Sequence, residues 1–449
     1  MVYLNQLVLE THMNIEQIMS LKEGLVEFLR PFEAGFVQRQ GLKHLETYSV
    51  GLLTDVKRKS IEPIALAAGR DERTLQWFLA QGAWDHDQAR ALLHYRVAAR
   101  RDKLRIGVMD ASGHLKKGDK TPGVQSQWCG ETGKKDNCVV GQHLLYTNND
   151  PNNPFSCMLA SDLFLPESWD QDRDRCRAAR IPDTLVHRTK WRIGIDQLEV
   201  AIGHGVRFDW VTFDEDYGTH AQFWFELDRL GLRAIGEVRA NFFAWATEPA
   251  CISGRAEHAA KRVDHLVTYS PAFTQQPWVR YRIKTTTTAV VEWEVKAALV
   301  QLVQEAGRNR HDGRSIPSQR RYWLIVARNV RTQEIKYFLS NALDASLEEM
   351  LRAAWARWHV EVWFERAKQE VGLGAFEMRN YPGLMRHWLI CSIVMLFLTE
   401  QTNRLRGEKS GHYVRAGGPC GESNRLAGVG PATPEPREVG EDQLLLPTP

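Results

Sequence analysis

The feature that most constrains the fold is the order of short apolar runs and amphipathic segments between residues 104 and 239. Three strand-like runs come first, followed by a helical pattern, a run, a second helical pattern and a last run. This βββαβαβ order predicts a mixed sheet with crossover helices, in which the first three strands form an antiparallel meander. The runs are 104–110, 138–147, 155–165, 207–213 and 232–239, and the helical patterns are 189–205 and 218–231.

Aspartates stand where two of these runs end. Asp110 closes the first run, and Asp214 directly follows the fourth. An Asp after a strand also commonly caps a helix or forms a turn, so neither residue alone predicts a site. Asp216 competes with Asp214 for the second position, and Asp214 is preferred because it directly follows the strand.

A third acidic residue lies in segment 353–373, whose apolar spacing predicts one helix. At about 100° per residue, Arg357, Glu361 and Lys368 share a narrow polar stripe beside the apolar one. A solvated face with an i,i+4 Arg–Glu pair also explains this stripe. Three carboxylates converging over a mixed sheet, however, suit two Mg²⁺ ions, because hard divalent cations take oxygen ligands.

The rest of the chain predicts further domains around a core of residues 99–239 and 341–406. Residues 1–98 have helical periodicity and predict a helical N-terminal domain, whose basic residues before a helix start near Ser60 suit DNA phosphates. Residues 240–340 are rich in Thr, Val and aromatic residues and predict an inserted, mainly antiparallel β module. Residues 407–449, rich in Gly, Pro and Glu, predict a disordered tail.

The composition indicates what class of protein this is, but it says little about what the protein does. The net charge is only +3, and the basic residues are clustered along the chain. Seven cysteines without a C-x-x-C motif predict a reducing compartment, and Cys129, Cys138 and His143 match the spacing of no common zinc site. The longest apolar run, 388–398, has about half of the roughly 20 residues that span a bilayer, so we expect a buried helix and no membrane segment.

Three stretches together resemble the DDE transposases of bacterial insertion sequences, in the branch with a β-strand insertion before the final Glu. They are VMDASGHLKKG around Asp110, with GVQSQWCGETGKKDNCVVGQ behind it, VTFDEDYG around Asp214 and RWHVEVWFERAKQEVGLGAFEMRNYPGLMRH around Glu361. The resemblance covers roughly residues 100–400 and implies an RNase-H-like core, a mixed five-stranded sheet flanked by helices. It also implies that Asp110, Asp214 and Glu361 bind two Mg²⁺ ions, for which Mn²⁺ can substitute.

The same branch carries a Tyr, an Arg and a Lys at fixed spacings around the Glu. Arg357 and Lys368 match two of these positions, and Ala354 stands where the Tyr is expected. Both basic residues are therefore expected to contact DNA phosphates.

Other expected DNA contacts lie outside this signature, and each has a simpler explanation beside it. Five basic residues are expected to touch phosphates, although an exposed loop or linker explains them equally well: Lys57, Arg58, Lys59, Lys116 and Lys117. Stacking on an unpaired base is implied for three tryptophans of the insertion, although core packing is the simpler explanation: Trp245, Trp278 and Trp293.

The implied function is that of a transposase in the bacterial cytoplasm, at the nucleoid. It would bind the terminal inverted repeats of its element, pair two ends as a homodimer or larger synaptic complex, cut a strand and join the freed 3′-hydroxyl to target DNA. Two alternatives stay open. One is an inactive or repurposed DNA-binding relative, and the other is a glycosidase whose paired acids work without metal, which a chelator would not inhibit.

Overall fold

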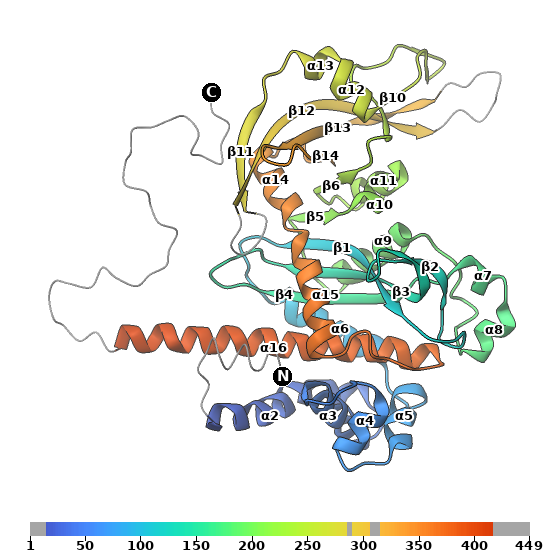
Figure 1. Ribbon diagram of the computed structural model, residues 1–449, viewed down its shortest axis with the longest axis vertical. Coiled ribbons are helices and arrows are strands. Elements are labelled where there is room, and N and C mark those ends of the chain that lie inside the picture. The colour runs from blue at the N-terminus through green and yellow to red at the C-terminus, as the bar shows by residue number, and fades with distance from the viewer. Residues whose placement is uncertain (1–14, 285–289, 306–314, 416–449) are drawn as a thin grey trace.

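The computed structural model describes residues 15–284, 290–305 and 315–415, and a mixed sheet runs through their centre (Figure 1). Within these residues the sheet has 12 strands, of which five form the expected core in the order β4-β3-β1-β5-β6. The β1/β3 and β3/β4 pairs are antiparallel, whereas β1/β5 and β5/β6 are parallel. The predicted α/β class with an RNase-H-like core is therefore confirmed. The core strands are β1 Ile106–Leu115, β3 Lys134–Thr147, β4 Ser156–Leu163, β5 Trp210–Phe213 and β6 Ala234–Val238.

The meander contains a strand that the sequence pattern did not predict. β2, Gln125–Cys129, pairs with the first part of β3 as a hairpin. Its alternating burial leaves Trp128 61% exposed, so its apolar signal is too weak to stand out from the surrounding loop.

The crossover helices begin where capping residues place them. α9, Lys190–Gly203, starts after Thr189, whose hydroxyl accepts a hydrogen bond from the Arg192 main-chain NH. The next crossover contains the short α10, Glu215–Gly218, and then α11, Ala221–Arg229. Two further short helices, α7 Glu167–Asp170 and α8 Arg173–Ala178, follow β4.

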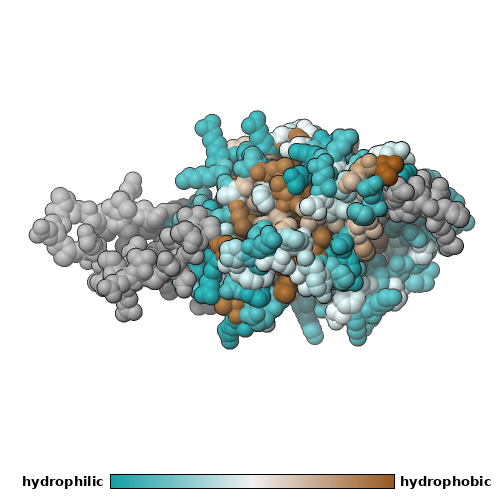
Figure 2. Space-filling view, turned by 90° about the horizontal axis from the view of Figure 1, so that it is seen from above, coloured by the Kyte–Doolittle hydropathy of each residue, from teal (hydrophilic) through white to brown (hydrophobic). Residues whose placement is uncertain are grey.

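The segment after β6 extends the same sheet instead of forming a separate one. β14 pairs with β6, and β13, β12, β7 and β10 follow in antiparallel order, with β11 on β12 (Figure 1). The expected antiparallel strands are present, although the helices α12 and α13 lie among them. The added elements are β7 Phe243–Trp245, β8 Cys251–Ile252, β9 Arg255–Ala256, β10 Lys261–Arg262, α12 Val263–Tyr269, α13 Pro271–Thr274, β11 Val279–Lys284, β12 Val290–Glu305, β13 Ile316–Asn329 and β14 Ile335–Ser340. Figure 2 looks onto this end of the molecule, where hydrophilic residues surround smaller apolar patches.

The helix predicted over 353–373 is wrong in one respect, because the structure breaks it at Ala356 and Arg357. α14, Leu347–Trp355, ends there, and α15, Trp358–Glu370, begins. Because of this break, the two helices pack against different parts of the protein. Trp355 packs on Trp293 and Phe338 of the insertion, at ring-centroid distances of 5.1 and 5.2 Å, whereas α15 lies against β1 of the core.

A long helix, α16 Tyr381–Arg415, lies between the sheet and the N-terminal helices α2 to α5, whereas α6 also contacts β4 of the sheet (Figure 1). By length and composition its residues 381–406 could cross a membrane, yet 89% of the apolar window is buried within the protein, as expected for a core helix. The helix also continues past residue 407, the predicted start of a tail, and residues 416–449 lie outside the described part. The N-terminal helices are α2 Ile15–Leu29, η1 Arg30–Gly35, α3 Gln40–Leu53, α4 Ile61–Ala67, α5 Glu72–Ala80 and α6 His86–Ala98.

Candidate active site

Asp110 lies at the point where the parallel pairing of β1 stops. Its strand does not end there as predicted, because β3 pairs with β1 along the whole of Ile106–Leu115. The parallel partner β5, however, reaches only as far as Phe213, which is opposite Met109. Asp110 directly follows Met109, and Asp214 directly follows Phe213, the partner of Met109 in the parallel pairing. The two aspartates therefore lie side by side at the end of the β1/β5 pair.

Burial and neighbouring carboxylates shape the ionisation of both aspartates. Burial, and then repulsion by Asp214, raise the pKa of Asp110 to about 7, against the opposing effect of Arg357. Burial, and then repulsion by Asp216, raise the pKa of Asp214 to about 6. The Asp214 carboxylate also caps α10 by accepting a hydrogen bond of 3.0 Å from the Asp216 main-chain NH. The two aspartates thus form a partly buried, negatively charged site that lacks enough positive charge to balance it.

Arg357 connects the third carboxylate to the first. It directly precedes α15 and places Nη1 3.5 Å from Asp110 Oδ2 and Nη2 2.8 Å from Glu361 Oε1. Burial acts to lower the pKa of Arg357, but the attraction of Asp110 and Glu361 outweighs it and keeps that pKa above its ordinary value. The Glu361 side chain is 59% exposed, so the site opens to solvent on this side.

Lys368 and Lys116 lie farther along the same face of the core. Lys368 Nζ is 3.4 Å from the Gly113 carbonyl oxygen and 3.5 Å from Glu131 Oε2. Lys116 donates a 2.8 Å hydrogen bond to the Gly374 carbonyl and lies 3.7 Å from the Phe376 ring centroid, and burial lowers its pKa to about 8. Lys117 is exposed.

The three basic residues before α4 differ in their surroundings. Lys57 is exposed, and Arg58 is exposed and forms a 3.1 Å ion pair with Glu377. Lys59 instead donates to the main-chain carbonyls of residues 52, 54 and 370, at 2.5, 3.1 and 2.6 Å. Its three N–H donors are therefore engaged within the protein.

The comparison with known proteins decides the family. A sequence model described as DDE superfamily endonuclease matches residues 31–297, more than half of the chain. The chain belongs to this family. It is also similar to a protein named "Probable transposase for insertion sequence element IS701" from Microchaete diplosiphon, with 24% identity over 367 residues, 80% of this chain and 82% of the relative.

The resemblance to DDE transposases of insertion sequences is thereby confirmed, and the protein is an enzyme of the nuclease and transposase type. The family match includes Asp110 and Asp214 and ends before α15. Endonucleases of this family generally use divalent metal ions, and transposases act on DNA.

The carboxylates of this DDE endonuclease fit a hard divalent cation by their chemistry. Such ions take oxygen ligands. Burial, and then repulsion between acids, raise the pKa of Asp110 and Asp214, and a cation would offset that repulsion. In the described ranges, no group of three or more His, Cys, Asp or Glu side chains is already arranged around a common point. Glu361 is instead held by Arg357.

Three residues around the candidate carboxylates have roles that sequence reasoning did not predict: Tyr217, Gln142 and Lys190. The Tyr217 hydroxyl donates to Gln142 Oε1, and burial followed by the charges of Asp110 and Asp214 raises the Tyr217 pKa well above its ordinary value. Asp216 pairs with Arg239 and lies 3.7 Å from Lys190, so the competing acid is occupied by cations. Tyr217 and Gln142 lie within the stretches that carry the family resemblance, whereas nothing local marked Lys190 or the contact between Tyr217 and Gln142.

Two of the three insertion tryptophans belong to the core of the endonuclease. Trp245 and Trp293 are 6% and 4% exposed. Trp278 is partly buried under the Arg328 guanidinium, whose carbon lies 4.3 Å from the ring centroid. Core packing is thus the observed role of Trp245 and Trp293.

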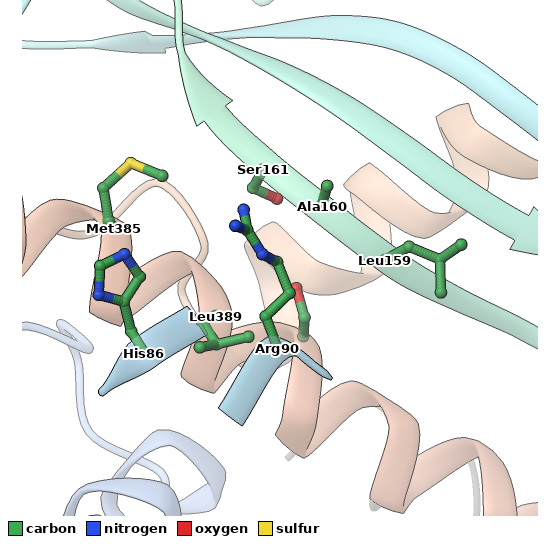
Figure 3. Close-up of a pocket in the computed structure, with 8 residues that line it drawn as sticks. His86, Arg90, Leu159, Ala160, Ser161, Met385 and Leu389 are labelled. Atoms are coloured by element: carbon green, nitrogen blue, oxygen red, sulfur yellow. The ribbon is translucent and has the colours of Figure 1, made fainter. Parts of the chain in front are cut away.

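A small cavity lies away from the carboxylates, between α6, β4 and α16 (Figure 3). With about 20 Å³ it has room for about one water molecule. Arg90 reaches into it and pairs with Asp87 at 2.6 Å, so the cavity belongs to the packing of these elements.

Proposed function

We propose that the chain is the transposase of an insertion sequence and that Asp110, Asp214 and Glu361 are its catalytic carboxylates. The observation that carries the proposal is the convergence of these residues from three separate segments. Asp110 and Asp214 adjoin at the end of the β1/β5 pair, and Arg357 joins Asp110 to Glu361. Solvation explains an Arg–Glu pair on a helix surface, but it does not explain why Arg357 also contacts Asp110, whose side chain is only 15% exposed.

One site serves two reactions because both are in-line attacks on phosphorus by an oxygen nucleophile. In the first, a water oxygen bonds to phosphorus and the bond to the 3′ oxygen breaks, so that oxygen takes a proton and becomes a hydroxyl. In the second, this hydroxyl loses its proton, bonds to a target phosphorus and displaces a target 3′ oxygen. The three carboxylates would hold the Mg²⁺ ions, or Mn²⁺ in their place. These ions would activate the nucleophile and stabilise the leaving oxygen.

The basic residues around the carboxylates orient the DNA. Arg357 and Lys368 face β1 from α15, where their charges suit the phosphates next to the cut bond. Lys57, Arg58 and Lys117 are exposed and extend the basic surface toward the N-terminal helices. Through these helices, residues 1–98, the transposase binds the terminal inverted repeats, and two copies or more pair the ends at the nucleoid.

The test is cleavage of a supercoiled plasmid that carries the gene's own flanking sequences, with Mg²⁺ or Mn²⁺. The wild type should cut at the element ends, and Asp110→Asn and Glu361→Gln should not, while both still bind those ends. Glu365→Gln, an exposed carboxylate on the same helix, is the matched control and should cut normally. Equal cleavage by Glu361→Gln would sink the assignment, and binding without cleavage by the wild type would indicate a DNA-binding descendant.

A further inference from the structure

Helices α4 and α5 are two short helices joined by residues 68–71. Gly69 ends α4 with φ +61°, a left-handed conformation that L side chains rarely adopt. The Arg70 main-chain NH then bonds back to the Ala65 carbonyl at 2.9 Å. Asp71 begins α5 by accepting a 2.9 Å hydrogen bond from the Arg73 main-chain NH. Local chemistry therefore sets a sharp turn between the helices.

The two helices pack on each other through a small residue and an apolar stripe. Ala65 is fully buried, and its small side chain allows the helices to approach closely. From α5, Leu75, Phe78 and Leu79 are each at most 1% exposed. α3 contacts both helices and completes a three-helix unit. This is the organisation of a helix–turn–helix, in which the second helix enters the major groove of DNA.

The outer face of α5 carries side chains suited to reading bases. Arg73, Gln76 and Trp77 are exposed, Trp77 by 48%, and their spacing places them on one side of the helix. Arg pairs with guanine and Gln with adenine through two hydrogen bonds each in the major groove. Asp71 and Glu72 offset the charge of Arg70 and Arg73, which favours base contacts over an unspecific phosphate-binding surface.

The unit is held firmly against the catalytic core. Arg386 of α16 is buried, and its guanidinium donates to the carbonyls of Phe78 and Leu79 at 3.4 and 3.0 Å, and to that of Trp84 at 2.9 Å. Lys59, just before α4, reaches the carbonyl of Glu370 at the end of α15. Because these contacts fix α5 to the core, bases read by α5 would lie at a constant distance from the bond that is cut.

We propose that α4 and α5 form a helix–turn–helix that recognises the ends of the element, with Arg73 and Gln76 of α5 contacting base edges in the major groove. Lys57 and Arg58, in the loop before α4, contact the phosphates beside that groove. The inference rests on the proposed function, because it names the part of the transposase that selects its DNA.

The experiment compares binding of full-length protein to a duplex with the gene's terminal sequence and to a scrambled duplex of equal composition. Arg73→Ala and Gln76→Ala should each lower affinity for the terminal duplex by about 10- to 100-fold and change affinity for the scrambled duplex by less than about threefold. Arg30→Ala and Gln40→Ala, exposed residues elsewhere in the N-terminal helices, are the matched controls and should keep the wild-type ratio. Because all four side chains are exposed, melting temperatures should agree.

Single base-pair changes in the terminal duplex supply a second measurement. Arg73→Ala should become indifferent to one base pair that the wild type distinguishes. An unchanged ratio of terminal to scrambled affinity in both α5 variants would overturn the helix–turn–helix proposal, while loss of cleavage in Glu361→Gln would still support the catalytic site. Conversely, cleavage by the triad variants together with loss of end selection in Arg73→Ala would overturn only the catalytic assignment.

Discussion

Arg357 Nη1 lies 3.5 Å from Asp110 Oδ2, although 247 positions separate the two residues in the chain. The same guanidinium holds Glu361 at 2.8 Å, so one cation already offsets part of the charge of these carboxylates. Burial, and then the charge that remains, raise the pKa of Asp110 and Asp214. Four predictions follow from this balance and from the contacts of the N-terminal loop.

Replacing Arg357 with Ala should move the acid limb of the cleavage profile to higher pH. The guanidinium lowers the pKa of Asp110 and Asp214, so its removal raises both and delays their ionisation. Cleavage should fall by about tenfold or more at pH 7, and by less at pH 9. Arg357→Lys keeps the charge and should retain the position of the limb. An Ala variant with the wild-type profile would contradict a role for Arg357 in the site.

Asp110→Asn should be more stable than the wild type at high pH when divalent cations are absent. The folded pKa of Asp110 is about 7, whereas an unfolded Asp has a pKa of about 3.9. The folded state therefore binds more protons between these values, and this residue's contribution lowers the free energy of unfolding as the pH rises from about 4 to 7. Urea unfolding at pH 8 should favour the variant by about 1–3 kcal/mol, with a smaller difference at pH 5. A variant less stable than the wild type at pH 8 would refute the burial argument.

Mg²⁺ should raise the melting temperature of the wild type at constant ionic strength. A ligand that binds only the folded state stabilises it by about 2.7 kcal/mol at 100 times its Kd. Asp110→Asn and Glu361→Gln should lose most of this gain because each removes an oxygen ligand from the carboxylate set. Glu365→Gln should keep it, and an equal shift in all the variants would mean that Mg²⁺ binds elsewhere.

Substitution of Lys57 should affect DNA binding and substitution of Lys59 should affect stability, although only one residue lies between the two lysines. Lys59→Met leaves three main-chain carbonyls without their donor, so we expect it to lower the free energy of unfolding by about 1–3 kcal/mol. Lys57→Met should leave stability within about 0.5 kcal/mol and instead weaken DNA binding, with the salt slope reduced by about one. Chemical unfolding and binding at several salt concentrations measure the two effects. The reverse pattern would place Lys59 on the DNA.

Local patterns in the sequence were enough for most elements of the core and for their order. The run before Asp214 is β5, and the pattern after Thr189 is α9, because apolar periodicity and a capping residue act over a few neighbouring positions. The family was visible for the same reason, since its acids stand in short characteristic stretches.

The partners of individual side chains were decided only by the tertiary structure. Lys57 and Lys59 are the same residue type in one basic run, yet only Lys59 meets the carbonyl of Glu370, 311 positions away. The break at Ala356 likewise depends on Trp293 and Phe338, which receive Trp355. Helix and strand propensities come from neighbours along the chain, whereas hydrogen bonds, burial and pKa come from groups that folding brings together. Local sequence therefore determined most of the elements, and long-range packing decided where the helix before the third carboxylate breaks and which charges meet.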